Sequence, residues 1–375
     1  MPITLNGDTG IQTPMYNGTI TANAVTPSVN MKNRIINGAM VIAQRGTTGN
    51  ASAGGNFILD RFICYSSNTT PAVTQSSDAP TGFANSLLWT QSSAATRNSG
   101  DYYEIGHKIE GYNIADLNLG TANAKTFTVS FWVKSSVTGT YSFAIRNSSA
   151  TYAAYVSTYT ISVANTWQQV TSTITGATSG TWNITNGSGL EIYIDLGSGS
   201  ASQTSTYNSW IYGNGSALAS ASQVGFAQTA GATFYITGVQ LEVGSTATSF
   251  EYLDYGRSLF QCQRYFEIAC STGYNNGLAC SNFNAADTYA SVRFAVTKRA
   301  TPVVTVASPA NSWNLYGNGS LSYVVTAIQA QNVGNTSFQL RISTANQLNQ
   351  GGASHLDFNT VTVANSGGWN ASAEL

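Results

Sequence analysis

Apolar and polar residues alternate with period two through most of the chain, and this pattern predicts β-strands. Between Phe127 and Lys134, phenylalanine and valine occupy every second position, and Thr, Ser, Trp and Lys fill the others. The same alternation recurs at residues 141–145, 190–196 and 234–243. Turn-forming pairs such as Asn186-Gly187 separate these segments. Many short strands at this spacing predict an all-β protein built around a jelly-roll β-sandwich.

The pattern divides the chain into four expected parts. The first residues contain few large apolar side chains but carry turn signals at Asn6-Gly7 and Asn17-Gly18, so they need a partner surface to become ordered. A short helical stripe with Leu259 and Phe266 is the one convincing helical pattern. We expect an extended anchoring leader at 1–56, the jelly roll at 57–254, a helical connector at 255–268 and a smaller β-sandwich at 269–375.

Composition narrows the possible functions. Only 8% of the 375 residues are charged and the net charge is −1, whereas soluble domains average about 25% charged residues. A nucleic-acid-binding surface needs clustered Lys and Arg, so we expect no nucleic-acid partner. No run of 18 apolar residues occurs, so we expect no membrane insertion. Ser, Thr, Asn, Gln and Gly must therefore solvate the surface, as in β-rich extracellular and virion-surface proteins.

Neither the N-terminus nor the cysteines contain a recognisable targeting or metal-binding motif. The first eight residues lack the basic and apolar regions of a secretory signal peptide, so an extracellular role would need release by lysis within a virus particle. Cys64, Cys262, Cys270 and Cys280 fit no zinc or redox motif. Cys270 and Cys280 are close enough in sequence for a bridge, but buried free thiols are the simpler interpretation.

Several segments together resemble bacteriophage tail-fibre and receptor-binding proteins. Residues 31–40 (MKNRIINGAM), 43–46 (AQRG) and 59–62 (LDRF) are similar to the entry motif of that group. Its jelly roll, which is like a carbohydrate-binding module, is similar to 127–134 (FTVSFWVK), 166–170 (TWQQV) and 236–244 (ITGVQLEVG). Its small C-terminal domain resembles 262–266 (CQRYF), 298–302 (KRATP) and the final Ala-Glu-Leu.

The resemblance implies a virion structural protein that forms homotrimers and meets the host surface. Residues 1–30 would contact other virion proteins, and the host partner would be a surface glycan. Two particle locations stay open: a tail fibre or receptor-binding protein, or a capsid decoration protein or head fibre that stabilises the shell. A leader inserted into a tail hub would favour the first, and a leader lying across capsid subunits would favour the second.

We expect no enzymatic activity. The chain has two histidines, no GxSxG elbow, no HExxH motif and no phosphate-binding loop. A polysaccharide depolymerase, the remaining alternative, needs only two carboxylates. The candidates are Asp101, Glu104, Glu110, Asp116, Glu191 and Asp195. Glu191 and Asp195 share one face of a strand, opposite the apolar set, and we expect them to be solvated.

Sugar binding needs aromatic rings that stack on C–H groups, and amides that bridge hydroxyls. Three loops offer this combination, although each ring could instead lie in a core or a trimer interface. The candidates are Trp182 with Asn183; Tyr207, Trp210 and Tyr212; and Trp313 with Tyr316. For Trp210 the resemblance favours a structural role.

A structural calcium ion is a further expectation, because jelly-roll carbohydrate modules often hold one through carboxylates. Asp60 and Glu242 are the candidate ligands, although no Asp-rich loop is present. Arg34, Arg45 and Arg61 form the one noticeable cluster of cations. We expect them to be buried against carboxylates such as Asp60 or Glu251 rather than to bind anionic glycans.

Overall fold

The computed structural model describes residues 5–6, 10–11, 31–148, 152–269, 278–306, 313–317, 322–345, 348–358 and 368–375. The chain forms two compact units, 1–32 and 33–375. In the first, β1 (Leu5–Asn6) pairs antiparallel with β2 (Gly10–Ile11). The rest of the predicted anchoring segment 1–30, and Cys270, lie outside the described residues.

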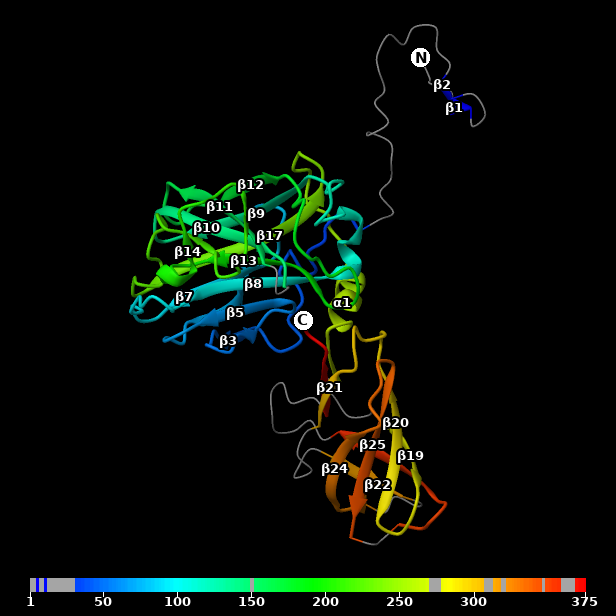
Figure 1. Cartoon of the computed structure of the whole chain (residues 1–375). Coiled ribbons are helices and arrows are strands. Elements are labelled where there is room, and N and C mark those ends of the chain that lie inside the picture. The colour runs from blue at the N-terminus through cyan, green and yellow to red at the C-terminus, as the bar shows by residue number, and fades with distance from the viewer. Residues whose placement is uncertain are drawn as a thin grey trace. The chain divides into compact units, whose positions relative to one another are not determined.

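Two large sheets build the first part of the second unit (Figure 1). The seven-stranded sheet has the order β15-β11-β10-β13-β8-β5-β4 and the six-stranded sheet the order β12-β9-β17-β7-β6-β3. The first sheet contains β4 (Asn56–Phe57), β5 (Phe62–Ser66), β8 (Tyr103–Glu110), β10 (Gly139–Arg146), β11 (Ala153–Ile161), β13 (Ser188–Asp195) and β15 (Trp210–Tyr212). The second contains β3 (Thr48–Asn50), β6 (Ala72–Ser76), β7 (Ser86–Gln91), β9 (Phe127–Ser135), β12 (Gln168–Ile174) and β17 (Ala232–Val243).

The apolar set of the alternation forms the core of this sandwich. Phe131 of β9 packs edge-to-face on Phe143 of β10 and on Tyr159 of β11, with ring centroids 5.4 and 5.5 Å apart. These residues belong to one continuous buried cluster that includes residues of both sheets. Neighbouring strands within each sheet are antiparallel. The predicted all-β class with jelly-roll sandwiches is confirmed.

Residues 33–56 correct the expected extent of the leader. They were expected to be extended, but Ile35, Met40 and Ile42 are buried at the sandwich core and β3 joins the six-stranded sheet. Asn37 holds this segment in place, because its side-chain amide donates to the carbonyls of Ile42 and Asp60, both at 2.9 Å. A stretch with four large apolar residues in ten gains more from burial than from extension.

One α-helix, α1 (Tyr255–Gln263), is present in the described residues, inside the stretch predicted as a connector. The Asp254 carboxylate caps its first turn by accepting a hydrogen bond from the amide of Arg257 at 3.0 Å. Within the described part of the chain, no helix is long and apolar enough to cross a membrane.

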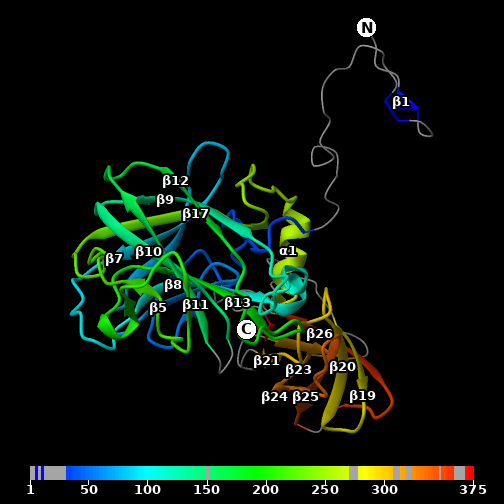
Figure 2. The ribbon, with the colours of Figure 1, turned by 45° about the horizontal axis from the view of Figure 1, so that its top comes forward.

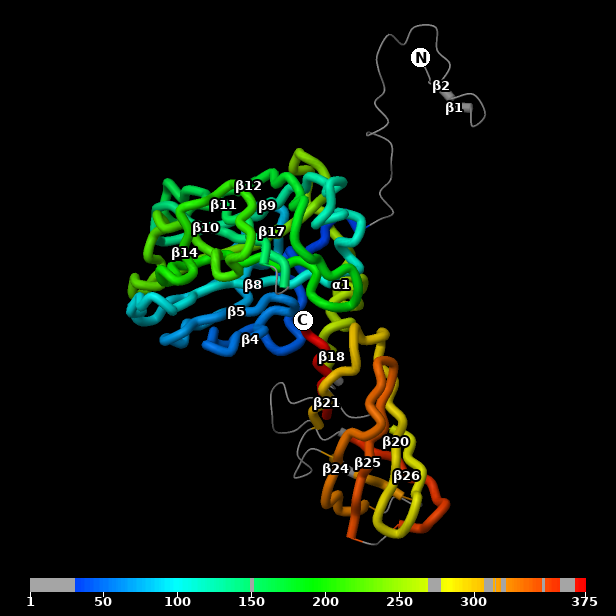
Figure 3. Tube along the Cα trace, viewed as in Figure 1, coloured from blue at the N-terminus to red at the C-terminus, as the bar shows by residue number. Residues whose placement is uncertain are grey.

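A second β-sandwich follows the helix (Figure 3). It has its own hydrophobic core. Its small sheet has the order β18-β27-β21, and its large sheet the order β23-β22-β26-β19-β20-β25-β24. Phe294, Phe338 and Trp369 pack together between the sheets. The strands are β18 (Phe266–Ala269), β19 (Leu278–Asn282), β20 (Asp287–Arg293), β21 (Val303–Val306), β22 (Trp313–Tyr316), β23 (Ser322–Tyr323), β24 (Val325–Gln331), β25 (Ser337–Thr344), β26 (Ala353–Phe358) and β27 (Trp369–Ser372).

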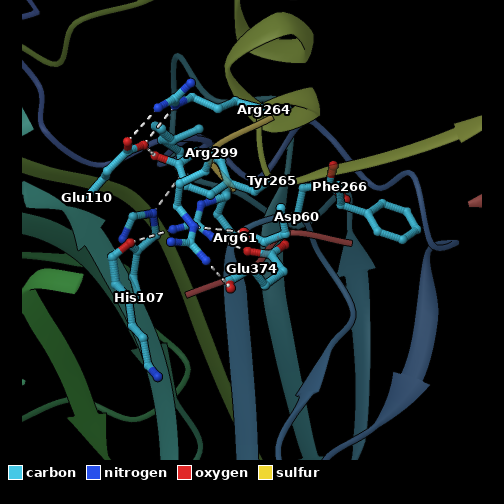
Figure 4. Close-up of polar contacts among 12 residues, drawn as sticks. Asp60, Arg61, His107, Glu110, Arg264, Tyr265, Phe266, Arg299 and Glu374 are labelled. Atoms are coloured by element: carbon cyan, nitrogen blue, oxygen red, sulfur yellow. Dashed lines mark hydrogen bonds and ion pairs between the residues drawn. The ribbon is translucent and has the colours of Figure 1, made fainter. Parts of the chain in front are cut away.

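A buried ionic cluster joins the end of the chain to the first sandwich (Figure 4). Arg61 is 1% exposed, forms an ion pair with Glu374 and lies over the ring of Tyr265 at 3.7 Å. Arg45 pairs with the same carboxylate at 3.1 Å. Arg45 also lies 3.7 Å from the expected partner Asp60, so the expectation of arginines against buried carboxylates is confirmed for Arg45. Arg61 instead pairs with Glu374, more than 300 residues away, and Arg34 pairs with the half-exposed Asp116.

Further contacts complete this cluster. Arg264 donates two hydrogen bonds, of 2.8 and 2.5 Å, to the Glu110 carboxylate. The Tyr265 hydroxyl donates to the same carboxylate at 2.7 Å. Arg299 donates to the carbonyls of Ala373 and Glu374 at 2.8 and 3.0 Å. The two sandwiches are thus linked by charge-assisted hydrogen bonds, which are stronger than neutral ones.

Glu374→Gln should lower the free energy of unfolding by about 3 kcal/mol or more, because it leaves the buried guanidinium of Arg61 without a charged partner. Urea unfolding of the full chain would measure the loss. Asp254→Asn is the matched control, since its ion pair with Arg257 is exposed and the asparagine still caps the helix. Equal stability of the two variants would contradict a buried Arg61 charge that depends on Glu374 as its partner.

Candidate functional site

The outer face of the seven-stranded sheet carries an unusual set of polar and aromatic side chains. On β8 the residues pointing away from the core include Glu104, Gly106 and Lys108, because Tyr103, Ile105 and Ile109 belong to the core. On β13 the corresponding residues include Glu191 and Tyr193. Figure 2 shows β5, β8 and β13 among the strands of this sheet, and their pairing places these side chains together.

The segment 200–222 covers one half of this outer face. Its Leu218 packs on Ala144, Ala154 and Val156 of β10 and β11, where small side chains leave room for the covering chain. The other half stays open as a cleft of about 390 Å³. The cleft is lined by Tyr65, Tyr102, Glu104, Lys108, Arg146, Tyr152, Tyr193, Ser202, Gly215, Ser216 and Leu218.

Four tyrosines line the cleft, and three of their rings lie near one another. Tyr65 lies 6.2 Å from the ring of Tyr102, edge-to-face, and 6.4 Å from the ring of Tyr193. Gly106 makes this arrangement possible, because a Cβ at that position would lie only 2.8 Å from the Tyr193 ring. Burial raises the pKa of Tyr65 to about 12, so its hydroxyl is neutral at physiological pH.

The polar part of the cleft is organised around Glu191, which is 2% exposed. Arg146 donates to it through Nε at 2.8 Å, and the Tyr193 hydroxyl donates to the same oxygen at 3.1 Å. Lys108 lies 3.8 Å from its other oxygen. Arg146 also donates to the carbonyl of Gly215 at 2.8 Å, which fixes the covering segment to the sheet.

Glu104 differs from Glu191 in having an oxygen without a partner. It is 5% exposed, yet its Oε1 accepts no hydrogen bond from the residues that the structure describes. Burial first, and then the neighbouring Asp195, raise the pKa of Glu104 to about 8 against the lowering effect of Arg146. At neutral pH the carboxyl group is therefore largely protonated. The residue lines the cleft, but its unpartnered Oε1 is buried.

Glu191 and Asp195 were expected to be solvated, and this expectation is wrong. Both are at most 2% exposed. Asp195 accepts hydrogen bonds from the amides of Gly197 at 2.7 Å and Ser198 at 2.9 Å. The outer face of the sheet is covered rather than open at this point, because the segment that follows β13 folds back over it.

The aromatic residues predicted for sugar binding in the first sandwich are divided between core and surface. Trp182 is 7% exposed and belongs to the core. Trp210 is partly buried and packs edge-to-face against it, with centroids 5.6 Å apart. Tyr207 and Tyr212 are about half exposed, but neither lines the cleft. Asn183 is exposed, and its carbonyl accepts a hydrogen bond from the amide of Thr185 at 2.8 Å.

The two aromatic residues predicted for sugar binding in the second sandwich, Trp313 and Tyr316, lie on opposite faces of β22. Trp313 is 4% exposed and lies in the core, so its ring is not open to a ligand. Tyr316 points the other way and stacks on His355, with centroids 5.1 Å apart. Core packing explains both Trp182 and Trp313, because a tryptophan buries more apolar surface than any other side chain.

The expected calcium ligands are already engaged by the protein. Asp60 accepts hydrogen bonds from the amide of Gln44 at 3.1 Å and from its side chain at 2.5 Å. Glu242 accepts from the amide and hydroxyl of Thr248 at 2.8 and 2.6 Å. No group of three or more potential metal ligands occurs among the described residues, so nothing in this part of the chain supports the calcium prediction.

The described cysteines form no disulfide bond. Cys64, Cys262 and Cys280 are free and buried. Burial raises the pKa of Cys280 to about 12. Cys280 is therefore not bridged, and the simpler interpretation of buried free thiols is correct for these three residues.

Sequence reasoning missed the cleft. Glu104 was named as a candidate carboxylate for catalysis, but Tyr65, Tyr102 and Tyr193 were not singled out. A signal was available, since glutamate, glycine and lysine alternate with core residues along β8 and tyrosine follows the same period in β5 and β13. These alternating polar and tyrosine residues indicate a solvent-exposed face of the sheet unless the segment that covers the neighbouring strands is known.

No protein-family model matches the chain, and no curated protein matches it. Among solved structures, the chain is similar to the enzymatically active domain of tailspike protein 4 of bacteriophage CBA120. The identity is 15%, the match covers 56% of this chain and 21% of that one, and the TM-score is 0.32. The chain thus spans about a fifth of that tailspike structure.

Two smaller proteins are matched over most of their length. One is a putative sugar-binding protein from Bacteroides thetaiotaomicron, with 12% identity over 57% of this chain and 100% of that one, at a TM-score of 0.32. The other is a family 11 carbohydrate-binding module of a cellulosomal cellulase from Clostridium thermocellum, with 13% identity over 51% and 91% and a TM-score of 0.28.

Glu104→Gln should become more stable relative to the wild type as the pH rises. The folded-state pKa of about 8 exceeds the ordinary value of 4.5, so the unfolded chain loses this proton first. Wild-type stability therefore falls between about pH 5 and pH 8, by up to about 1.4 kcal/mol per pH unit, and levels off above.

Urea unfolding at a series of pH values would measure the difference between the two proteins. Asp116→Asn, at a half-exposed carboxylate paired with Arg34, serves as the control and should show no such trend. A constant difference between wild type and Glu104→Gln from pH 5 to pH 9 would contradict the raised pKa.

Proposed function

We propose that this chain is a non-enzymatic structural protein of a phage particle, a tail fibre or receptor-binding protein, that adheres to host surface glycans through the cleft on its seven-stranded sheet. The observation that carries the binding role is the combination of tyrosine rings and an unsatisfied buried carboxyl group in one open cleft. Outside a binding site, leaving such a group without a partner would cost stability.

The chemistry of the cleft suits a sugar. Tyr65 offers a partly exposed aromatic ring to C–H groups, and the buried Tyr193 ring packs beside it. Glu104, Lys108 and Arg146 add charged and polar groups that can bridge hydroxyls. The low charge of the chain, 8% of residues, gives little long-range steering, so several copies acting together would supply firm adhesion.

The lining of the cleft favours binding over hydrolysis. Glycoside hydrolysis needs two carboxyl groups that flank the scissile bond. Glu104 is the one carboxyl group among the described residues that line the cleft. Glu191 lies behind it, buried and held by Arg146 and Tyr193. A carboxylate in that position is not free to reach a sugar.

The motifs at 31–46 and 236–244 support the assignment to a phage particle. In such a protein, residues 1–30 would attach to other virion proteins and the chains would form a homotrimer, so that three clefts act on one surface. Such a protein would be made in the host cytoplasm and would leave the cell within the released virion.

Tyr65→Ala should weaken glycan binding about five- to tenfold, because the loss of one stacking ring removes about 1–1.4 kcal/mol of binding free energy. Binding would be measured on an array of bacterial surface polysaccharides with the full chain. Tyr212→Ala removes an exposed ring outside the cleft and is the matched control.

Two results would contradict this part of the proposal. Loss of binding in Tyr212→Ala but not in Tyr65→Ala would move the site to the loop predicted from sequence. Release of reducing ends from a retained polysaccharide by the wild-type protein would replace adhesion by hydrolysis.

The homotrimer is tested by light scattering on the full chain. We expect a mass three times that of the 39.5 kDa chain, at concentrations below those used for binding. A species of single-chain mass at every concentration would contradict trimer formation by the isolated protein. Immunogold labelling of particles with an antibody to the chain would then show whether it is part of the virion.

A further inference from the structure

We propose that the cleft takes an acidic glycan, and that the ammonium group of Lys108 pairs with the negatively charged group of that glycan, a carboxylate or a phosphate. This inference rests on the proposed glycan-binding function of the same cleft. It adds the chemical class of the ligand, anionic rather than neutral or basic, and the residue that selects it.

The charged groups that a ligand can reach in the cleft are positive. Two cations, Lys108 and Arg146, are among the described residues that line it, and the side chain of each is 22% exposed. The carboxyl groups of Glu104 and Glu191 belong to residues that are buried. An entering ligand therefore meets an ammonium and a guanidinium group before it meets a carboxylate, and this disfavours a basic sugar.

Arg146 already uses its charge within the protein. Its Nε donates to Glu191 at 2.8 Å, its Nη1 donates to the carbonyl of Gly215 at 2.8 Å, and its Nη2 lies 3.3 Å from the Tyr193 hydroxyl. The other oxygen of Glu191 accepts a hydrogen bond from the Ser188 hydroxyl at 3.2 Å. Arg146 and Glu191 thus balance each other, and both oxygens of this carboxylate have donors without the help of Lys108.

Lys108 is the cation that has no hydrogen-bond acceptor. Its Nζ lies 3.8 Å from Glu191, beyond hydrogen-bond distance, and it donates to no residue that the structure describes. Glu104 does not balance its charge, because burial raises the pKa of Glu104 to about 8. Asp195 is fully buried and accepts hydrogen bonds from the backbone that follows it. An anionic ligand would supply the missing acceptor, in a charge-assisted hydrogen bond that is stronger than one to a neutral hydroxyl.

The sheet places Lys108 within reach of a ligand that contacts the aromatic part of the cleft. Tyr65 lies opposite a residue of β8 that comes four positions before Lys108 and points to the same face, about 13 Å away along a strand that rises 3.3 Å per residue. Between these two positions, the buried Tyr193 ring and Ile63 close the space over Gly106. A chain of sugar units that stacks on Tyr65 can therefore run across this apolar floor to Lys108.

The experiment measures binding of the full chain to a panel of bacterial surface polysaccharides, some acidic through uronic acid or phosphate groups and some neutral. Each uronic-acid polysaccharide is tested before and after its carboxyl groups have been reduced to hydroxyls. The wild type is compared with Lys108→Gln, Lys108→Arg and Lys125→Gln. Lys125 is exposed and does not line the cleft, so its variant is the matched loss of one positive charge.

We expect the wild type to bind acidic polysaccharides and to bind a uronic-acid polysaccharide about tenfold more weakly after reduction. Lys108→Gln should lose about tenfold in affinity for the unreduced form, because one hydrogen bond between charged groups is removed. Lys108→Arg and Lys125→Gln should bind like the wild type. An increase in salt from about 0.01 M to about 1 M should weaken the wild type more than Lys108→Gln, because salt screens the charge of the lysine.

The outcomes separate this inference from the proposed function. Binding of neutral polysaccharides alone, or equal affinities of the wild type and Lys108→Gln for the acidic ones, would overturn the acidic class and leave the glycan site intact. Equal losses in Lys108→Gln and Lys125→Gln would overturn the role of Lys108. Absence of binding to every polysaccharide would overturn both proposals.

Two features of the design keep the result clear. Binding confined to the uronic-acid members or to the phosphate-bearing members would support the inference and identify the anion. The comparison of unreduced and reduced polysaccharide uses the wild type alone, so poor folding of Lys108→Gln would not prevent the test.

Discussion

Both faces of the seven-stranded sheet lose water when the protein folds, and the candidate site depends on this double burial. The inner face packs on the six-stranded sheet, and the segment 200–222 covers the outer face of β10 and β11. The cover stops short of β5 and β8, which leaves an open cleft with a desolvated floor. A carboxyl group on such a floor is costly to ionise, and this property distinguishes Glu104 from a surface glutamate.

Charged residues are few in this chain, and the structure concentrates many of them in two buried clusters. One lies behind the cleft around Glu191 and orients Arg146 and Tyr193. The other links the two sandwiches through Arg61, Arg264 and the end of the chain. A buried ion pair gives little net stability compared with an apolar contact, but removing one partner is expensive. Both clusters therefore fix geometry more than they add stability.

The candidate cleft and the loops predicted from sequence share a kind of chemistry but not a location. Both combine aromatic rings with polar groups, but Trp182 and Trp313 are core residues. Of the four tyrosines that line the cleft, Tyr65 and Tyr193 lie in strands. The sequence around these tyrosines, next to Cys64 and Ile192, does not show which face of the sheet will stay open. That depends on the segment 200–222, which covers part of the sheet from elsewhere in the chain.

The sequence by itself determined the all-β class, the strand periods and the short helix, because side chains alternate between the two faces of a strand and apolar residues collect on one of them. Only the tertiary structure decided that 33–56 belongs to the sandwich, that Glu374 meets Arg61, and that Glu104 lies in a cleft. These contacts join segments tens to hundreds of residues apart. A local sequence pattern does not identify the distant segment that will contact it. Burial of the second face of a sheet can therefore be seen only in the folded chain.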